Sequence, residues 1–453
     1  MRKTGLAPER FSVASGIETA EEGIEAGERR TDRQRRPPRT LVAQLGVTPG
    51  RVVRVCGWAV TDPTTPSGSA VADHTGTVAL LGPETTPPRG SAIDVVGAVV
   101  EDGSTGGRAM VVQSLEVAGP SEPEAPLGGA ATLEERLDWR YLDLRRAPAR
   151  LVFEVQTTLE KAMRKVWDAH GFVELHTPKL MATGPRPEEL FALDYFDGRA
   201  WLAQSPQFYK QMAMAAGLER VFEIGPVFRA EAALDGRHAT EFTSVDVEMA
   251  WIDSEADVMA FAEEWICYTV AAVADRHGEQ IAQSGRGPVA ALRAPFPRVT
   301  LAEAWEIAQR CGHPGGEGDL DPDAERSLGD AIADQHGSEM VWVTDYPAPL
   351  RPFYHMASSE GSPLTRSFDL LWKGLEVASG AQREHRHDRL VAQARSRERA
   401  LGPIGHYLDF FRFGCPPHGG FGFGLNRLLM CLLGYDDLRE VTLLPRDRIR
   451  LSP

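Results

Sequence analysis

The fold of this chain is decided by the stretch VFEIGPVFRAE at residues 221–231, followed by EFTSVDVEMAW at residues 241–251. In both segments apolar and polar side chains alternate, which is the pattern of a β-strand with one packed face. Between them, Asp235 and Gly236 predict a hairpin turn. The pair would form either the floor of a cleft or a sheet with one solvated face. The polar positions are Glu223, Arg229, Glu231, Phe242, Ser244, Asp246 and Glu248.

Two segments further along the chain carry charges beside glycines. SFDLLWKGLEVASGAQREH, residues 367–385, has the composition of a strand with two acids and an arginine around a glycine-containing turn. HGGFGFGLNRLLMCLLG, residues 418–434, is a glycine-rich approach to an apolar helix that has Arg427 near its start. Such a helix start can bind an anion, or the glycines can serve a packing turn. Several charged strands together favour a cleft over a solvated sheet face.

Composition divides the chain into four parts. Residues 1–39 are charged and without apolar periodicity, which predicts a mobile tail, either solvated or in contact with nucleic acid. Residues 40–119 alternate short β-rich runs with turns and predict a small all-β barrel. Residues 120–131 are rich in Pro, Gly and Ala and predict a linker. Residues 132–453 predict one α+β domain, in which 254–345 is a helical scaffold.

The overall composition narrows the class of protein. The chain has 453 residues with 49 Lys and Arg against 64 Asp and Glu, a net charge of −15, so a nucleic-acid partner would need a local basic face. No apolar run reaches the roughly 20 residues that span a bilayer, and the start MRKTGLAPERFSVASG lacks the apolar core of a secretion signal. We therefore expect a cytoplasmic protein without membrane contact. The five cysteines are widely spaced, so we expect neither a zinc site nor a disulfide.

These segments, in this order, resemble the signature motifs of the class II aminoacyl-tRNA synthetases, and in particular of the archaeal-type aspartyl-tRNA synthetases. The resemblance covers most of 132–453 and includes SPQFYKQMAMAAGLERVFEIGPVFRAE at 205–231 and LLPRDRIRLSP at 443–453. It implies an antiparallel catalytic sheet flanked by helices, preceded by an OB-type anticodon-binding barrel. The helix near 149–170, which leads to Pro178, resembles the family's dimer-interface motif, so a homodimer is implied.

The resemblance also implies the reaction. The chain would join L-aspartate to ATP as aspartyl-adenylate and pass the aspartyl group to the 3′ end of tRNA(Asp), with tRNA(Asn) as a further acceptor. Because the attacking carboxylate is already ionised, positioning and charge neutralisation must carry the rate. Arg229 would grip the α-phosphate and Arg427 the far phosphates, as the catalytic pair, while Phe242 stacks on adenine and Glu231 accepts from its amino group. The implied ATP-binding residues are Arg229, Ala230, Glu231, Arg237, His238, Phe242, Glu376, Gly424 and Arg427.

The same resemblance implies a magnesium site and an aspartate site, since Mg²⁺ prefers hard oxygen ligands. The implied metal ligands are Asp369, Glu376 and Ser379. The side-chain carboxylate of aspartate would meet Arg383 and Lys210, and its ammonium group would meet Asp246. Asparagine would leave both cations under-compensated. The implied aspartate-binding residues are Gln207, Lys210, Arg229, Asp246, Ser379 and Arg383.

Three departures from the family pattern keep other functions open. In MATGPRPEELF, residues 181–191, two prolines stand where relatives carry a flexible Glu-Gly-Gly loop, so either Glu188 acts from a shifted position, or the loop closes differently, or the amino acid differs. Asn426 replaces an acid of the family. The barrel segment 69–82 has no aromatic to stack on bases, which leaves Trp58 either for stacking or for the core. The alternatives are a paralogue that adenylates aspartate or an analogue for a non-tRNA acceptor, and a catalytically idle regulatory paralogue.

Overall fold

The computed structural model divides the chain into two compact units, Met1–Gly128 and Gly129–Pro453. Most of the predicted tail, residues 1–35, and the altered loop at 183–189 lie outside the described residues. Within the part of the chain that is described, no helix is both long and apolar enough to cross a membrane. The described residues are 36–46, 51–61, 68–82, 86–101, 107–122, 124, 126–182 and 190–453.

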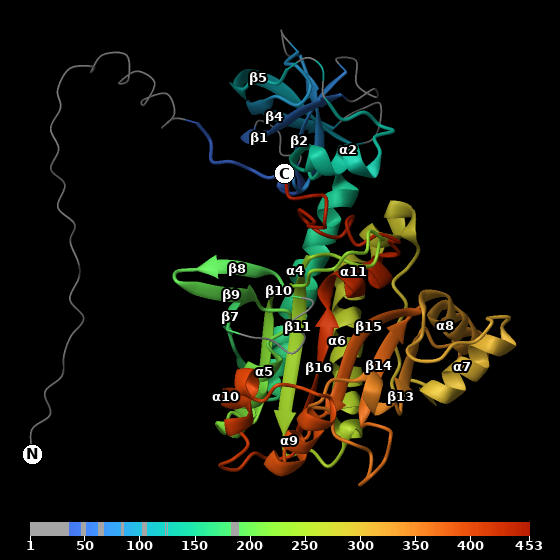
Figure 1. Cartoon of the computed structure of the whole chain (residues 1–453). Coiled ribbons are helices and arrows are strands. Elements are labelled where there is room, and N and C mark those ends of the chain that lie inside the picture. The colour runs from blue at the N-terminus through green and yellow to red at the C-terminus, as the bar shows by residue number, and fades with distance from the viewer. Residues whose placement is uncertain are drawn as a thin grey trace, which may run out of the picture. The chain divides into compact units, whose positions relative to one another are not determined.

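The first unit is a closed five-stranded barrel (Figure 1). The strands close in the order β1-β2-β3-β5-β4, with β3 and β5 parallel. Alternate residues such as Val55, Leu80 and Val95 are fully buried in its core, as the β-rich runs predicted. Trp58 is 36% exposed and lies outside that core, so its ring belongs to the barrel surface. The elements are η1 (Val42–Gln44), β1 (Val52–Thr61), β2 (Ser69–Asp73), β3 (Gly76–Leu81), β4 (Ala92–Glu101) and β5 (Arg108–Gly119).

The second unit is built on an eight-stranded sheet with the order β12-β13-β14-β15-β16-β11-β10-β6. Its neighbours are antiparallel except for the pairs β12–β13 and β10–β6. A small separate sheet has the order β7-β9-β8. The strands are β6 (Val173–Glu174), β7 (Leu180–Met181), β8 (Ala192–Tyr195), β9 (Gly198–Leu202), β10 (Arg220–Phe228), β11 (Glu241–Ala250), β12 (Arg298–Thr300), β13 (Met340–Thr344), β14 (Ser367–Trp372), β15 (Leu375–Gln382) and β16 (His418–Gly424).

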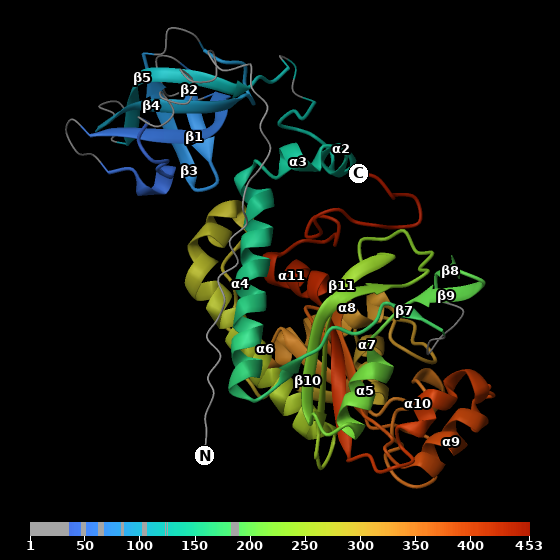
Figure 2. The ribbon, with the colours of Figure 1, turned by 90° about the vertical axis from the view of Figure 1, so that its left-hand side faces the viewer.

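Helices cover both faces of this sheet, which confirms the predicted α+β class. Helices α4 (Ala147–Ala169) and α6 (Glu255–Ile281) pack with α11 (Leu425–Leu433) against one face, where Val245 and Val247 are buried (Figure 2). On the opposite face, α5 (Gln207–Ala215), α9 (His387–Ser396) and α10 (Gly405–Asp409) share one cluster around Tyr407. Helices α7 (Leu301–Arg310) and α8 (Pro322–His336) share another cluster with Val341 and Val343. The shorter elements are α2 (Leu133–Asp138), α3 (Arg140–Asp143), η3 (Ala282–Arg286), η4 (Ala348–Leu350) and η5 (Gly402–Ile404).

The portion 254–345, for which the sequence predicts a helical scaffold, contains α6, α7 and α8 and also supplies β12 and β13 to the edge of the sheet. Strand β13 reads MVWVT, and its first four residues are buried. A strand packed on both faces lacks the alternation of apolar and polar residues that marks a half-exposed strand. In a run of five residues the spacing of apolar side chains cannot distinguish such a strand from part of a buried helix. The helices here carry clear start signals: Ser254 and Thr300 each form a capping box.

Candidate active site

One face of the large sheet carries a polar row that crosses five neighbouring strands. Glu223 on β10 lies opposite Asp246 on β11, and Asp246 lies opposite Gly422 on β16. Gly422 lies opposite Ser379 on β15, which in turn lies opposite Asp369 on β14. Residues directly opposite one another share a face of the sheet. Charged segments from distant parts of the sequence therefore meet on one floor.

Lys210 lies at one end of this floor and is almost fully buried. It comes from α5, whose Ala213 and Met214 pack against the same face of the sheet. Its Nζ donates to Asp246 Oδ1 at 3.0 Å and to the carbonyl oxygens of Val247 and Phe421 at 3.3 and 3.1 Å. Glu248 Oε2 lies 3.3 Å from the same nitrogen. The ammonium group is thus held in place by three donated hydrogen bonds.

Arg383 follows the last residue of β15 and is equally buried. Its Nε donates to Glu248 Oε1 at 3.0 Å, and its Nη2 donates to Glu248 Oε2 at 3.4 Å and to the carbonyl of Gly420 at 2.9 Å. Nη1 lies 2.9 Å from His355 Nε2. The absence of a side chain at Gly420 makes the contact between Arg383 and Glu248 possible. A Cβ at residue 420 would lie 2.8 Å from the carboxyl carbon of Glu248 and would also collide with the carbonyl oxygen of Val247.

Lys210, Asp246, Glu248 and Arg383 form a buried charge cluster of two cations and two anions. Burial alone would raise the pKa of Glu248, but Arg383 and Lys210 together hold that pKa below its usual value. Without substrate, the cluster is neutral as a set. A bound asparagine would therefore not leave Lys210 and Arg383 as bare cations, since Asp246 and Glu248 already face them.

A chain of neutral polar groups lies behind the charge cluster. Gln211 accepts from Gln207 Nε2 and from the Tyr407 hydroxyl, both at 3.0 Å, which directs its amide NH₂ to His418 Nε2 at 3.0 Å. His418 Nδ1 lies 2.8 Å from the carbonyl of Pro416, so the ring is a neutral tautomer with its proton on Nδ1. Burial lowers the pKa of His418 to about 4. Gln207 belongs to the scaffold of the site in this arrangement.

The three predicted metal ligands lie beside Arg351. This arginine forms an ion pair with Asp369 and donates from Nη1 to Ser379 Oγ at 3.4 Å. The second oxygen of Asp369, Oδ1, is buried without a hydrogen-bond partner. Burial, with the nearby charge of Asp369, raises the pKa of the half-buried Glu376. An orphaned carboxylate oxygen beside a second acid fits a divalent cation that is also held by phosphates.

Two arginines meet next to Glu376. Arg427, in the first turn of α11, donates to the carbonyl of Glu376 at 2.9 Å and to that of Arg237 at 3.4 Å. Arg237 reaches across to α8, where it donates to Glu325 Oε2 at 2.7 Å, and also to the carbonyl of Gly374 at 3.3 Å. Burial raises the pKa of Glu325 to about 7, although the charge of Arg237 opposes this shift. The two guanidinium groups form a cationic end of the floor.

Arg229 and Phe242 lie at the hairpin end of β10 and β11. The guanidinium carbon of Arg229 is 5.2 Å from the centre of the Phe242 ring, a cation–π distance. Glu231 accepts from the backbone N–H of Ala233 at 3.0 Å. His238 Nδ1 lies 2.9 Å from Asp235 Oδ1 in the hairpin loop, where both side chains are partly exposed. Ala230 is exposed, and Gly424 is the N-cap residue of α11.

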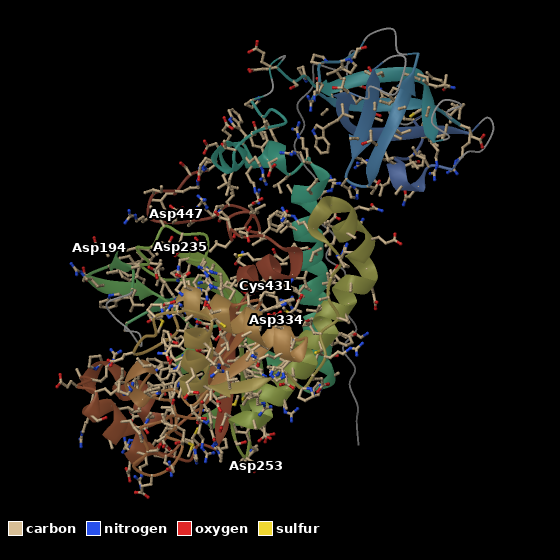
Figure 3. The ribbon with its side chains drawn as sticks, turned by 90° about the vertical axis from the view of Figure 1, so that its right-hand side faces the viewer. Asp194, Asp235, Asp253, Asp334, Cys431 and Asp447 are labelled. Carbon is tan, nitrogen blue, oxygen red and sulfur yellow. The ribbon has the colours of Figure 1, made fainter. Side chains whose placement is uncertain are left out.

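The hairpin loop packs against the C-terminal segment. Leu438 donates its backbone N–H to the carbonyl of Gly236 at 2.8 Å, and Thr240 donates to that of Arg446 at 2.9 Å. Asp235 and Asp447, labelled in Figure 3, line the same hollow of about 200 Å³ between these segments. The loop that carries Arg237 is therefore backed by the end of the chain.

Several residues of the site were missed from the sequence. Arg351 and His355 come from an irregular segment before β14, and Glu325 comes from the acidic helix α8, where one more acid gives no signal. Gln211 and His418 looked like ordinary helix and loop residues. Glu248 was placed on the polar side of its strand, and only the position of Gly420 across the ladder shows how it reaches Arg383.

Residues 132–448 match the family described as tRNA synthetases class II (D, K and N). Together with the polar floor and its two arginine-bearing ends, this match shows that the chain belongs to the class II aminoacyl-tRNA synthetases, ligases that join an amino acid to tRNA with ATP. The family predicted from the motifs is thereby confirmed.

Among its relatives, the Aspartate--tRNA(Asp/Asn) ligase of Methanopyrus kandleri is 41% identical over 432 residues, which cover 90% of this chain and 98% of that protein. The Aspartate--tRNA(Asp) ligase of Pyrococcus horikoshii is 42% identical over 353 residues, or 76% of this chain and 80% of that protein. The solved asparaginyl-tRNA synthetase of Pyrococcus horikoshii, complexed with asparaginyl-adenylate, superposes with a TM-score of 0.83 at 30% identity and covers 92% of this chain and 100% of that one.

Proposed function

We propose that this chain activates L-aspartate with ATP and transfers the aspartyl group to tRNA. The observation that carries this is the common floor: the buried charge cluster and the arginine pair Arg237 and Arg427 lie at two ends of one polar sheet face. An amino acid bound at the first end presents its α-carboxylate toward a nucleotide phosphate bound at the second. The relatives named as aspartate ligases support aspartate as the amino acid.

In the first step, one oxygen of the substrate carboxylate attacks the α-phosphorus of ATP and pyrophosphate leaves. Arg229 neutralises the charge that grows on the α-phosphate, and Arg427 holds the leaving phosphates, since a guanidinium can contact two oxygens at once. Mg²⁺ held by Asp369, Glu376 and Ser379 would supply further charge neutralisation. In the second step, a hydroxyl of the terminal ribose of tRNA attacks the acyl carbon, and AMP leaves.

Within the charge cluster, Asp246 is the acid for the substrate ammonium group and Arg383 is the cation for its side-chain carboxylate. Lys210 then acts mainly as a positioning residue, because its ammonium hydrogens already bond Asp246 and two backbone carbonyls. Asparagine is disfavoured because its neutral amide accepts weaker hydrogen bonds from Arg383 than the side-chain carboxylate of aspartate does. This keeps the predicted aspartate preference but assigns it to the added charge of the substrate.

The acceptor is tRNA(Asp), and charging of tRNA(Asn) is the further activity that the mixed names of the relatives support. The barrel would contact the anticodon through its surface, where Trp58 is exposed. We further propose a homodimer, from the resemblance of residues 149–178 to the family's interface motif. Sedimentation equilibrium of the full chain tests the dimer, and a monomer across the micromolar range would contradict it.

Aspartate-dependent exchange of pyrophosphate into ATP, followed by charging of purified tRNA(Asp) and tRNA(Asn), tests the proposal. We expect exchange with aspartate and charging of at least tRNA(Asp). Exchange without charging of either tRNA would indicate that the aspartyl group is transferred to an acceptor other than tRNA. Absence of exchange with every amino acid would indicate a catalytically idle regulatory paralogue. Arg383→Leu should abolish aspartate-dependent exchange. Retained exchange in that variant would remove Arg383 from its role.

A further inference from the structure

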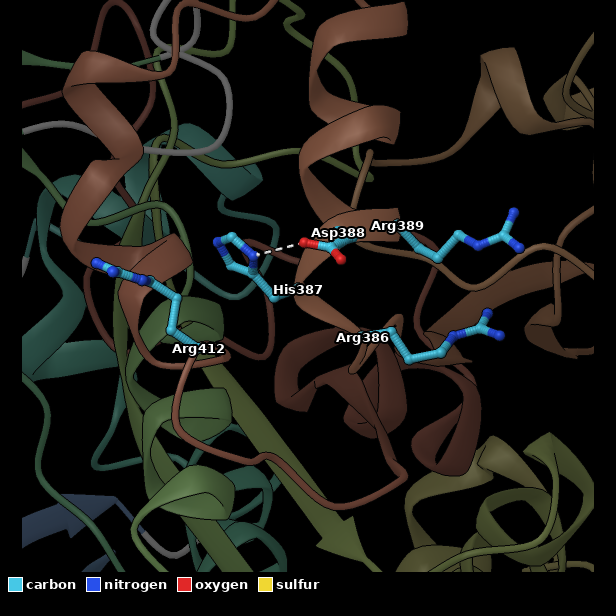
Figure 4. A pocket seen from close by; sticks show the side chains of 5 residues that line it. All are labelled: Arg386, His387, Asp388, Arg389 and Arg412. Atoms are coloured by element: carbon cyan, nitrogen blue, oxygen red, sulfur yellow. Dashed lines mark hydrogen bonds and ion pairs between the residues drawn. The ribbon is translucent and has the colours of Figure 1, made fainter.

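A group of charged side chains outside the polar floor surrounds a surface hollow of about 490 Å³. This hollow, the basic pocket, is lined by Arg386, His387, Asp388, Arg389 and Arg412. The first four lie at the start of α9, and Arg412 follows α10 (Figure 4). The chain carries a net charge of −15, yet residues 385–412 contain six arginines against three acidic residues. The pocket therefore gathers guanidinium groups on an acidic protein, each of them paired with a nearby carboxylate.

Two arginines of the basic pocket, Arg389 and Arg412, are held loosely enough to take a new partner. Arg386 pairs with Glu384 at 2.7 Å, Arg389 with Glu360 at 2.6 Å and Arg412 with Asp409 at 2.9 Å. The three arginine side chains are each about half exposed, from 50% to 55%. The pairs of Arg389 and Arg412 are exposed on both sides and contribute little to stability, so a phosphate can replace their carboxylates at small cost, whereas Arg386 stays bound to the buried Glu384.

The directions of these side chains favour a chain of phosphates over a single small anion. In Figure 4 the guanidinium group of Arg412 points away from those of Arg386 and Arg389, and His387 lies between them. Groups that diverge cannot enclose one anion, but they can contact successive phosphates of one strand.

An exposed aromatic adds a second feature of single-strand binding. Phe413 is 86% exposed, and the guanidinium carbon of its neighbour Arg412 is 5.6 Å from the ring centre. Unpaired nucleotides are bound by aromatic rings on which bases stack, combined with arginines along the backbone. A large ring left in water beside a basic pocket suits an unpaired nucleotide better than a paired helix.

The pocket is also close to the charge cluster along the chain. Arg386 is three positions after Arg383, so their Cα atoms lie within about 11 Å of each other. We propose that the basic pocket and Phe413 bind the unpaired 3′ end of tRNA as it approaches the adenylate. This inference rests on the proposed function, and it assigns the substrate's last nucleotides to a surface that plays no part in activation.

The double variant Arg389→Glu/Arg412→Glu tests this proposal, with Arg310→Glu as the matched control, an exposed arginine of α7 whose closest acid is Glu306 at 4.0 Å. We expect aspartate-dependent exchange without tRNA to be unchanged in both variants. The KM for tRNA in charging should rise about tenfold or more in the double variant only, and its dependence on salt should weaken because two phosphate contacts are lost. Phe413→Ala should raise the same KM by about tenfold, and Phe413→Tyr should restore it.

Binding of two tRNA transcripts locates the contact. Wild-type protein should bind full-length tRNA(Asp) more tightly than a transcript that lacks its unpaired 3′ nucleotides, and the double variant should bind both equally. An equal loss of affinity for both transcripts would place the contact elsewhere on tRNA and overturn the proposal. Unchanged charging by the double variant would also overturn the proposal. It would favour an acidic protein as the partner of the pocket.

Two controls separate this proposal from the proposed function. If the wild-type protein shows neither exchange nor charging, the proposed function fails and the pocket is judged by transcript binding alone. If the double variant loses exchange, Arg389→Gln/Arg412→Gln replaces it, since neutral side chains avoid repulsion with the exposed carboxylates of Asp409 and Glu360. Loss of exchange in that variant as well would put these arginines in the activation step and contradict the proposal.

Discussion

Glu248 lies on β11 and Arg383 directly follows β15, a strand that is not a neighbour of β11, and the two residues form a buried ion pair across the bare backbone of Gly420. Their contact at 3.0 Å joins β11 to the end of β15 over the intervening strand β16. Glu248 is therefore both a counter-charge for the site and a structural tie across the sheet.

Glu248→Gln should destabilise the second unit by about 3–5 kcal/mol, because it leaves Arg383 and Lys210 buried with one anion fewer. Urea unfolding followed by tryptophan fluorescence measures the change. Glu241→Gln, at the exposed start of the same strand, is the control and should change stability by less than about 0.5 kcal/mol. Equal stability of the two variants would show that Glu248 is not needed to balance the cluster.

Gly420→Ala should destabilise the second unit by about 3 kcal/mol or more, because its Cβ would overlap the Val247 carbonyl and the Glu248 carboxylate. Gly278→Ala, in α6, is the matched control, since a Cβ there meets nothing within 4 Å. That control should gain about 0.5–1 kcal/mol from helix propensity. A Gly420→Ala variant that unfolds like the wild type would mean that β11 and β16 can move apart freely.

Glu325→Gln should lower the KM for ATP roughly three- to tenfold. The amide oxygen keeps an acceptor for Arg237, while a negative charge near the bound phosphates is removed. Pyrophosphate exchange at varied ATP measures the effect, and the KM for aspartate should stay constant. Glu317→Gln, on the exposed loop before α8, serves as control. A higher KM for ATP in Glu325→Gln would show that the charge of Glu325 is needed to orient Arg237.

The neutral ring of His418 predicts a loss of stability in acid. In the folded chain the pKa of His418 is about 4, against about 6.5 in the unfolded chain, so between these values the unfolded state binds more protons. Stability should fall as pH drops from about 6.5 to 4, by up to about 3 kcal/mol from this residue.

Burial lowers the pKa of His355 as well, which acts in the same direction. His418→Gln should therefore flatten, but not remove, the acid limb of a plot of unfolding free energy against pH. His336→Gln, an exposed histidine at the end of α8, should leave the limb unchanged. If His418→Gln has the same limb as the wild type, the ring does not stay neutral in the fold.

The sequence was informative where one face of an element is buried and the other carries chemistry. The strands at 220–228 and 241–250 show that alternation, and with their motifs they pointed to the floor and to the synthetase family. Strand β13 shows no alternation because both of its faces are packed. Its place in the sheet follows from pairing with β14, a contact between segments that are far apart in sequence.

The partners of the predicted residues could not be found in the same way. Arg351 reaches Asp369 from a segment without regular structure, and Glu325 reaches Arg237 from a helix rich in acids. Local pattern shows which face a residue occupies, but tertiary packing decides which opposite charge it meets. For this reason the sequence indicates Lys210 and Arg383 only as cations for the aspartate carboxylate, and the structure gives each an anion of its own.

Strand β16 supplies only backbone between the charged side chains of β11 and β15. Because residues 420 and 422 are glycines, β16 has no side chain on this face whose substitution could change the amino-acid preference. Redesign toward another substrate would have to act through Asp246, Glu248 or Arg383, each of which also balances its neighbours. Replacing one of these residues alone would leave an unbalanced charge in the buried cluster. Substrate choice in this scaffold should therefore change by paired substitutions that keep the charges balanced.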